Sequence, residues 1–138
     1  MIVLIREYND SDIPFITFLG RGIDNNFSFK LNNVSKCFVY DDLSIIGFII
    51  ADIYDDRAEI IDVAVNVNDR KKGIGSKLLE YVINLCKEKG CKSITLEVKY
   101  NNVPAIELYK KYDFKVISVR KKYYENGTID AHLMFREL

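Results

Sequence analysis

The sequence predicts an α/β fold in which helices flank one mixed, mostly antiparallel central sheet. The chain opens with several runs of β-favouring residues, continues with two segments whose apolar residues recur at helical spacing, and closes with two more β-rich runs. Its 138 residues are 49% hydrophobic and include two prolines, which suits one globular domain with its own core. We therefore expect residues 1–138 to form a single domain.

The first half of the chain is expected to form mainly strands. Asn9 to Asp12 supply helix-capping side chains before an irregularly apolar stretch, 13–31, whose structure the pattern defines least. Polar turns at Asp41 to Ser44 and at Asp55 to Arg57 separate the next strands. The predicted strands of this half are residues 3–8, 37–40, 45–53 and 58–67.

The second half alternates between strands and helices. A helix begins at Ile74 and is expected to end at Gly90, because apolar residues recur at steps of three and four. Asn101 or Asn102 caps a second helix with Pro104 in its first turn. Its buried face is expected to carry Ile106, Tyr109 and Tyr112. The remaining strands are predicted at 93–99, and at 116–124 and 128–135 around a tight turn at Glu125-Asn126-Gly127.

Composition and charge exclude several functional classes. Twenty basic residues balance twenty acidic ones, so no excess positive charge attracts nucleic acid or an anionic membrane. The first apolar run, from Met1 to Ile5, is too short for a secretory signal or a membrane span, and we expect a cytoplasmic protein. Three cysteines without a Cys-x-x-Cys pair and a single histidine, His132, give neither a disulfide framework nor a metal site.

The segment Arg70-Lys71-Lys72-Gly73-Ile74-Gly75-Ser76 carries the most chemical information. It lies between a predicted strand and a strongly amphipathic helix. Its glycines allow the backbone close to a ligand, and a helix N-terminus offers free N–H groups to a pyrophosphate. The dinucleotide fingerprint does not fit, because Leu78 stands where its third glycine is needed. The P-loop does not fit either, because it needs four residues between its glycines and then Gly-Lys. The alternative is a glycine-eased turn without a ligand.

The chain resembles the GNAT family of acetyltransferases, most closely its ribosomal-protein-alanine N-alpha-acetyltransferase (RimI-like) branch. Arg-Lys-Lys-Gly-Ile-Gly is similar to that family's pyrophosphate loop, and the residues 61–65 before it are similar to its central strand. The similarity continues through Leu96-Glu97-Val98 and the residues that follow, which are Asn102, Ala105, Ile106, Leu108, Tyr109 and Phe114. The resemblance implies the GNAT acyl-CoA N-acyltransferase fold and acetyl-coenzyme A as co-substrate, without a metal.

The resemblance also assigns roles to individual residues. Backbone groups of Val63, Ala64 and Val65 would face the acetyl and pantetheine groups, and Tyr109 would protonate the departing thiolate. The remaining cofactor contacts are expected to be Arg70, Lys71, Lys72, Gly73, Ile74, Gly75, Ser76 and Asn102. Without the family match, Tyr109 would be taken as an aromatic core residue.

Glu97 matches the glutamate that acts as general base in this branch. An α-amino group, with a pKa near 8, needs less help from a base than a lysine near 10.4, which favours N-termini as acceptors. Glu59 is a rival base, because another branch of the family uses a glutamate in that strand. Glu97 could also be no more than a polar residue on the outer face of its strand.

Tyr123 and Tyr124, with the Asp-Ala-x-x-Met run that begins at Asp130, are similar to the signature of enzymes that acetylate protein N-termini. The two tyrosines should face opposite sides of their strand, so that one can line a substrate groove. Two features depart from the family: Asp113 replaces a glycine before Phe114, and residues 13–36 lack a Pro-Trp element. The acceptor of the branch therefore cannot be carried over directly.

The expected activity is transfer of an acetyl group from acetyl-coenzyme A to a primary amine, with the N-terminal α-amino group of a protein as the leading acceptor. A small-molecule amine or a lysine side chain is the second interpretation within the same fold. A catalytically inactive coenzyme A-binding regulatory module is the interpretation from another class. We expect no nucleic-acid or membrane partner, and either a monomer or a homodimer.

Overall fold

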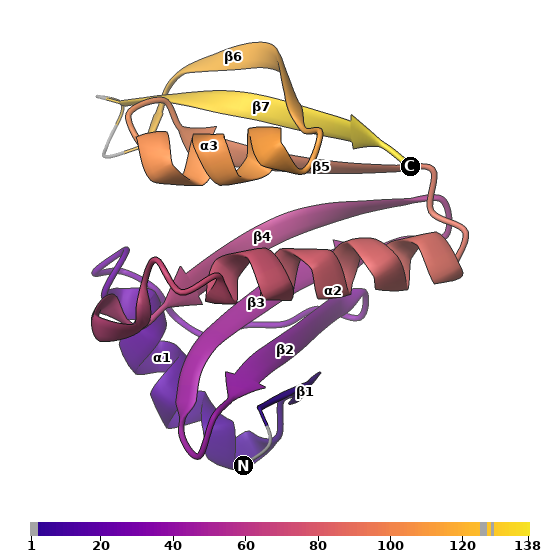
Figure 1. Ribbon diagram of the computed structural model, residues 1–138. Helices are drawn as coiled ribbons and strands as arrows, with labels where there is room; N and C mark the ends of the chain where they lie inside the picture. Colours follow the sequence, from indigo (N-terminus) through magenta and orange to yellow (C-terminus); the bar gives the residue numbers. More distant parts are fainter. Residues whose placement is uncertain (1–2, 125–126, 128) are drawn as a thin grey trace.

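The computed structural model describes residues 3–124, 127 and 129–138 and contains a seven-stranded sheet (Figure 1). The strands lie in the order β1-β2-β3-β4-β5-β7-β6, and neighbouring strands are antiparallel except for β4 and β5. Their bounds are β1 Leu4–Glu7, β2 Ser35–Asp41, β3 Ile45–Ile53, β4 Arg57–Val65, β5 Ser93–Lys99, β6 Lys115–Tyr124 and β7 Ile129–Glu137. The predicted fold class, a mixed and mostly antiparallel sheet with helices, is confirmed.

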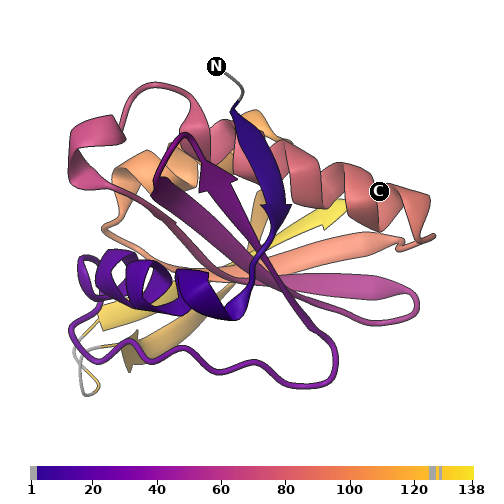
Figure 2. The ribbon, with the colours of Figure 1, turned by 90° about the horizontal axis from the view of Figure 1, so that it is seen from below.

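Helices cover both faces of the sheet. The long helix α2 (Ile74–Glu88) and the shorter α3 (Val103–Lys111) share one hydrophobic core with the sheet, whereas α1 (Ile13–Arg21) lies over a second core on the opposite face. Figure 2 shows α1 and α2 on opposite sides of the strands. Below, the two sides of the sheet are called the α1 face and the α2/α3 face. Among the described residues, no helix is long and apolar enough to cross a membrane.

The sheet splits between β4 and β5, which pair in parallel. Pairing between β4 and β5 ends at Ile60 and Leu96, although β4 continues to Val65 and β5 to Lys99. The cause is a bulge: Ile50 of β3 pairs with Asp62 and Ala51 pairs with Ile60, so Ile61 is an extra residue in β4. A bulge bends and twists its strand. The two strands therefore diverge beyond Ile60, as Figure 1 shows.

The structure refines several predicted boundaries. The apolar stretch 13–31 contains one helix, which ends at Arg21, and residues 22–34 form no further helix or strand. Asn102, rather than Asn101, caps α3, where its Oδ1 accepts the Ala105 N–H at 3.3 Å. The predicted tight turn involves residues 125 and 126, which lie outside the described residues.

Asp12 at the start of α1 makes no side-chain capping bond to α1, and its carboxylate is held instead by Arg6 and by the short helical turn before it. Its side chain is 6% exposed and accepts two hydrogen bonds from Arg6, at 2.8 and 3.1 Å. It also accepts the backbone N–H of Asn9 at 2.9 Å. The hydrogen bond from Arg6 lowers the pKa of Asp12 despite the burial, so this carboxylate ties β1 to the start of α1.

Asp113 adopts the left-handed conformation that the sequence suggested. Its φ is +68°, and it follows the last turn of α3, where the Phe114 N–H donates to the Tyr109 carbonyl at 3.1 Å. A side chain in this region clashes with its own backbone, although aspartate tolerates the region better than most residues. The aspartate at this position therefore costs stability.

We expect Asp113→Gly to raise the free energy of unfolding by about 0.5 to 1 kcal/mol, because glycine adopts this φ without a steric penalty. For a chain of this size the midpoint of thermal unfolding should rise by about 2–4 °C. Asp55→Gly, in an exposed turn without positive φ, is the matched control and should not stabilise the protein. Equal shifts in both variants would contradict the argument.

Candidate active site

The glycine-containing loop ends in the first turn of α2. Gly73 is the N-cap of α2 with φ +82°, and no side chain caps the first N–H groups. Arg70 folds back so that its Nε donates to the Val65 carbonyl at 3.2 Å, and Lys72 pairs with Asp69 at 3.4 Å. The loop thus brings basic side chains to a helix N-terminus whose amides have no side-chain partner, a combination suited to an anionic group.

The two glycines of this loop differ in what the fold requires of them. A Cβ on Gly73 would meet nothing within 4 Å, so its left-handed φ, and not crowding, favours glycine there. A Cβ on Gly75 would lie 3.5 Å from Leu108 of α3, an ordinary contact. The fold alone therefore does not require glycine at position 75.

Two backbone N–H groups of β4 point into the split. The Asn66 N–H donates to Ile46 at the end of β3, at 2.8 Å. Because successive peptide groups of a strand point to alternate sides, the N–H of Ala64 also faces β3, and those of Val63 and Val65 face the side where β5 has diverged. These donors sit where the sequence analysis expected contacts with an acyl group.

Tyr109 approaches the split from the α2/α3 face. It lies in the last turns of α3, is 8% exposed, and packs its ring edge-to-face on Phe114 with centroids 5.8 Å apart. Burial, then the negative charge of Asp62 and the neighbouring phenol of Tyr124, raise the pKa of Tyr109 to about 12. The phenol is therefore fully protonated at neutral pH and available as a proton donor.

Glu97 lies on the α1 face, opposite to Tyr109. Its neighbour Leu96 faces the core under α2 and α3, and adjacent strand residues point to opposite faces. Oε1 accepts a hydrogen bond from Arg120 at 2.8 Å. Oε2 is buried and has no hydrogen-bond partner among the described residues. A buried oxygen with a free lone pair is the kind of group that receives a ligand or a bound water.

Two further carboxylates share the α1 face. Glu59 pairs in register with Asp52 and Thr95, and burial followed by the charges of Asp52 and Glu97 raises its pKa. Asp62 lies directly after the bulge and pairs with Ile50, whose side chain belongs to the core under α1. Burial, and then the charge of Asp24, raise the pKa of Asp62 to about 6.

Asp62 was not among the predicted site residues. One signal could have revealed it: it is the single charged residue in the apolar run 60–65 of a central strand. Charged side chains are rarely placed in such a position unless they are paired or functional. Asp62 was missed because the run was interpreted as the family's central strand, in which backbone groups and not side chains were expected to act.

The split joins the two faces into one site. Tyr109 lies on the α2/α3 face, whereas Glu59, Asp62 and Glu97 lie on the α1 face. A reacting carbonyl held by the N–H groups of β4 could therefore be attacked from the α1 face while its leaving group meets a proton donor on the other. Such an arrangement suits transfer of an acyl group between two substrates.

The paired tyrosines are arranged differently from the prediction. Tyr123 and Tyr124 were expected on opposite faces, but their rings pack edge-to-face with centroids 4.9 Å apart. The reason is the irregular end of β6, where the register shifts between Arg120 and Tyr124 and Lys122 has φ +51°. Tyr123 is 47% exposed and lies 3.9 Å from the Arg120 guanidinium, so both rings stand close to Glu97.

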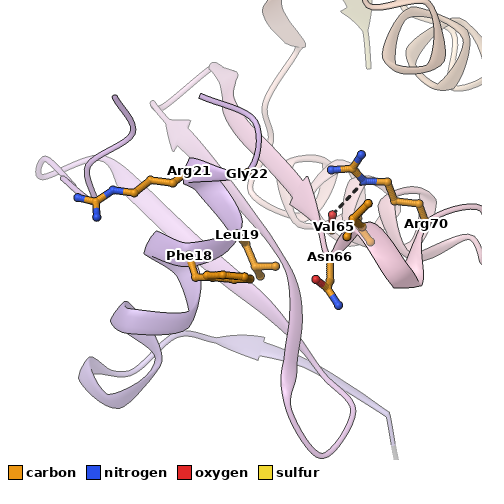
Figure 3. Close-up of a pocket in the computed structure, with 8 residues that line it drawn as sticks. Phe18, Leu19, Arg21, Gly22, Val65, Asn66 and Arg70 are labelled. Carbon is orange, nitrogen blue, oxygen red and sulfur yellow. Dashed lines mark hydrogen bonds between the residues drawn. The ribbon is translucent and has the colours of Figure 1, made fainter. Parts of the chain in front are cut away.

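A pocket of about 410 Å³ opens beside the end of β4 (Figure 3). Phe18 and Leu19 on α1 face Val65, Asn66 and Arg70 across it, as Figure 3 shows. Phe18 is 73% exposed and Val67 is 66% exposed, so the pocket presents two apolar side chains to the solvent. The remaining lining residues are Arg21 and Gly22.

Other expected residues have structural surroundings of their own. Asn102 caps α3, and Ser76 lies in the first turn of α2, whose Glu80 accepts a hydrogen bond from Tyr112 at 3.0 Å. His132 occupies a regular position in β7, between Val98 and Val119. In the described part of the chain, no three potential ligands gather as a metal site would require.

Comparison with known proteins identifies the family. The acetyltransferase (GNAT) family matches residues 5–114, which is most of the chain and includes β1 to α3. The chain therefore belongs to the GNAT family, and the resemblance drawn from its sequence is confirmed.

Relatives and solved structures agree with this assignment. The chain is 41% identical over 83 residues to an N-alpha-acetyltransferase of Saccharolobus solfataricus, covering 59% of this chain and 49% of that protein. It is 33% identical over 90 residues to the [ribosomal protein bS18]-alanine N-acetyltransferase of Escherichia coli, covering 64% and 61%. The chain thus spans only about half to three fifths of these relatives.

The fold similarity extends over the whole chain. A crystal structure of the ribosomal-protein-S18-alanine N-acetyltransferase from Escherichia coli matches with a TM-score of 0.88 at 23% identity, over 99% of this chain and 94% of that one. Arabidopsis thaliana NAA60 in complex with acetyl-CoA matches with a TM-score of 0.86 at 19% identity, over 99% of each chain. A structure with this fold thus binds acetyl-CoA.

We expect Asp62→Asn to stabilise the folded protein at pH 7.5. The pKa of Asp62 is raised from 3.8 to about 6, so the folded state disfavours its ionised form. Its cost to stability is full above pH about 6, shrinks as the pH falls from 6 to 4, and disappears below the unfolded value of about 3.9. Because the side chain is partly exposed, solvent screens some of its charge, and we expect the free energy of unfolding to rise by about 1–2 kcal/mol at pH 7.5.

Unfolding by urea at pH 7.5 and at pH 4 measures this difference. Because asparagine keeps the shape of the side chain and removes the charge, the gain should be present at the higher pH and nearly absent at the lower one. A loss of stability at pH 7.5 would mean that the carboxylate supports the fold.

Proposed function

We propose that this protein transfers the acetyl group of acetyl-coenzyme A to the α-amino group at the N-terminus of a protein or peptide. The observation that carries the proposal is the split between β4 and β5, which has a buried phenol, Tyr109, on one face and carboxylates on the other. Membership of the GNAT family supports acetyl transfer, and the N-alpha-acetyltransferase names of the relatives support an α-amino acceptor.

The pyrophosphate of acetyl-coenzyme A fits the start of α2. The free amides at Gly73 to Ser76 offer hydrogen-bond donors and the positive end of the helix dipole. Arg70, Lys71 and Lys72 add positive charge nearby. Asn102, which caps α3, is the last of the proposed contacts on this side of the split. The thioester carbonyl would then meet the N–H groups of Val63 and Val65.

Tyr109 is the proposed general acid. When the amine nitrogen bonds to the thioester carbon and the carbon–sulfur bond breaks, negative charge collects on sulfur and the phenol supplies the proton. In water a thiol has a pKa of about 8.5, so a phenol raised to about 12 is a weak acid toward it. Burial raises the pKa of the thiol as well, which narrows the difference between the two groups.

Glu97 is the proposed general base. Its Oε1 is held by Arg120 at 2.8 Å, which fixes the carboxylate and leaves the buried Oε2 without a protein partner in the described residues. Oε2, acting through a water, can receive the proton that the amine must lose. An α-ammonium group, with a pKa of about 8, loses this proton far more readily than a lysine side chain at about 10.4.

The pocket beside α1 supports a peptide acceptor. It lies on the α1 face, next to Val65, and is lined by apolar groups of Phe18, Leu19 and Val67. An apolar side chain of the acceptor would bury the exposed ring of Phe18 there. Tyr123 and Tyr124, close to Glu97 on the same face, are the proposed contacts for the peptide backbone.

Tyr109→Phe should lower kcat at least about 30-fold, since a positioned acid contributes about 10² or more. The Kd for acetyl-coenzyme A should change by less than twofold, because the phenyl ring keeps the packing on Phe114. Steady-state kinetics with a peptide acceptor and calorimetry with acetyl-coenzyme A give the two numbers. Unchanged turnover would remove Tyr109 from the mechanism.

A panel of acetyl acceptors tests the substrate class. Peptides with a free N-terminus and a large apolar first residue should react best, and Phe18→Ala should raise their KM about tenfold with little change for a peptide that begins with glycine. Phe18 is exposed, so the substitution should not affect folding. If polyamines or lysine side chains are acetylated faster than N-termini, the acceptor class proposed here is wrong.

A further inference from the structure

Asp62 occupies a position that the mechanism above does not use. It is the first β4 residue after the bulge and therefore the first whose side chain reaches the α1 face inside the split. The side chain is partly buried, and no hydrogen bond or ion pair to its carboxylate exists within the described residues. A carboxylate in such a place costs stability unless a positive group joins it.

Three other carboxylates near this side of the sheet have partners in the protein, whereas Glu59 has no hydrogen bond within the described residues but does feel the positive charge of Arg57. Glu97 binds Arg120 at 2.8 Å, and Asp12 binds Arg6 at the same distance. Asp52 accepts the Ser35 hydroxyl at 2.6 Å. Asp62 differs from them because, among the described residues, the charge that shifts its pKa is that of another carboxylate, Asp24.

Within the described residues, the groups that interact electrostatically with Asp62 include no cation. The groups that interact with it electrostatically are Cys37 of β2, Asp24 after α1, Tyr109 of α3 and Tyr124 of β6. The split therefore presents one unpaired negative charge next to two phenols, at the point where an amine must arrive.

We propose that Asp62 binds the acceptor in its ammonium form, so that the protein selects acceptors by the charge of the amine before that amine is deprotonated. This inference rests on the proposed function, because it concerns the same site and assigns how the acceptor is recognised. The carboxylate accepts a charge-assisted hydrogen bond from the ammonium group. No bond is made or broken in this step.

Binding of a cation at Asp62 also affects Tyr109. The negative charge of Asp62 is one reason why the pKa of Tyr109 is high, after burial itself. A bound ammonium group neutralises that charge and makes the phenol a stronger acid. The acceptor thus improves the proton donor that the reaction needs, and the donor is at its weakest while the α1 face is empty.

The role proposed for Asp62, which is to bind the ammonium group, differs measurably from that of a general base. A carboxylate that binds ammonium also stabilises the protonated amine, so its removal weakens acceptor binding without slowing the bound complex. We expect Asp62→Asn to raise the KM for a peptide acceptor at least about tenfold, with kcat unchanged or slightly higher and the KM for acetyl-coenzyme A unchanged. The acidic limb of the pH profile of kcat should move to lower pH, because the bound ammonium group loses its proton more readily without the carboxylate. A fall in kcat with an unchanged KM would overturn the proposal in favour of a base.

Calorimetry tests the same inference without requiring turnover. The probe is a lysine-free synthetic peptide with a free α-amino group, compared with its desamino analogue, each titrated into the protein saturated with coenzyme A. The wild type should bind the amino peptide at least about tenfold more tightly, and Asp62→Asn should bind both alike. Equal affinities in the wild type would overturn the proposal, as would a preference that survives in the variant.

The control variant is Asp56→Asn, which makes the same change of charge and shape just before β4. Asp56 is exposed, with its side chain 70% accessible, and lies far from the split in register. It should leave both measurements unchanged, and an equal effect from it would overturn the proposal. If the wild type discriminates the two peptides yet acetylates no N-terminus, acetyl transfer to N-termini is wrong while the ammonium site stands.

Discussion

The bulge at Ile61 is the constraint on which the site depends. It ends the pairing of β4 with β5 after Ile60 and Leu96, and it leaves the N–H groups of Val63 and Val65 without a strand partner. Unpaired backbone donors inside a sheet cost free energy unless another group accepts their hydrogen bonds. In the proposed mechanism a substrate carbonyl supplies such a group, so the same local defect would both open the sheet and provide the donors for catalysis.

The split also explains how groups on the two faces of the sheet could contribute to one reaction. The helices α2 and α3 bring the uncapped amides at the start of α2 and Tyr109 to one face, while β4 and β5 carry Glu59, Asp62 and Glu97 on the other. In a fully paired sheet these groups would be separated by a continuous layer of backbone. Two substrates can approach from opposite faces and meet only at the gap.

Much of the fold could be predicted because its signals are local. The helical spacing from Ile74, a cap at Asn101 or Asn102 and the alternation in β5 specify their elements by short-range contacts alone. The chain after Arg21 could not be predicted, since residues 22–34 follow the tertiary surface instead of a periodic pattern. The tyrosine pair was misjudged for a related reason: an ideal strand separates the two rings, whereas the register shift of β6 brings them together.

The sequence by itself determined the glycine loop, the helix behind it, Glu97 and Tyr109 as candidates, and the family that joins them, because residue type and spacing carry that information. Only the tertiary structure decided which groups share a face, that Arg120 occupies one oxygen of Glu97, and that Asp62 lies unpaired in the described part of the split. The physical reason is that pairing and burial depend on residues distant in the chain. The residue type gives the charge of a side chain, but it does not give the group with which that side chain pairs.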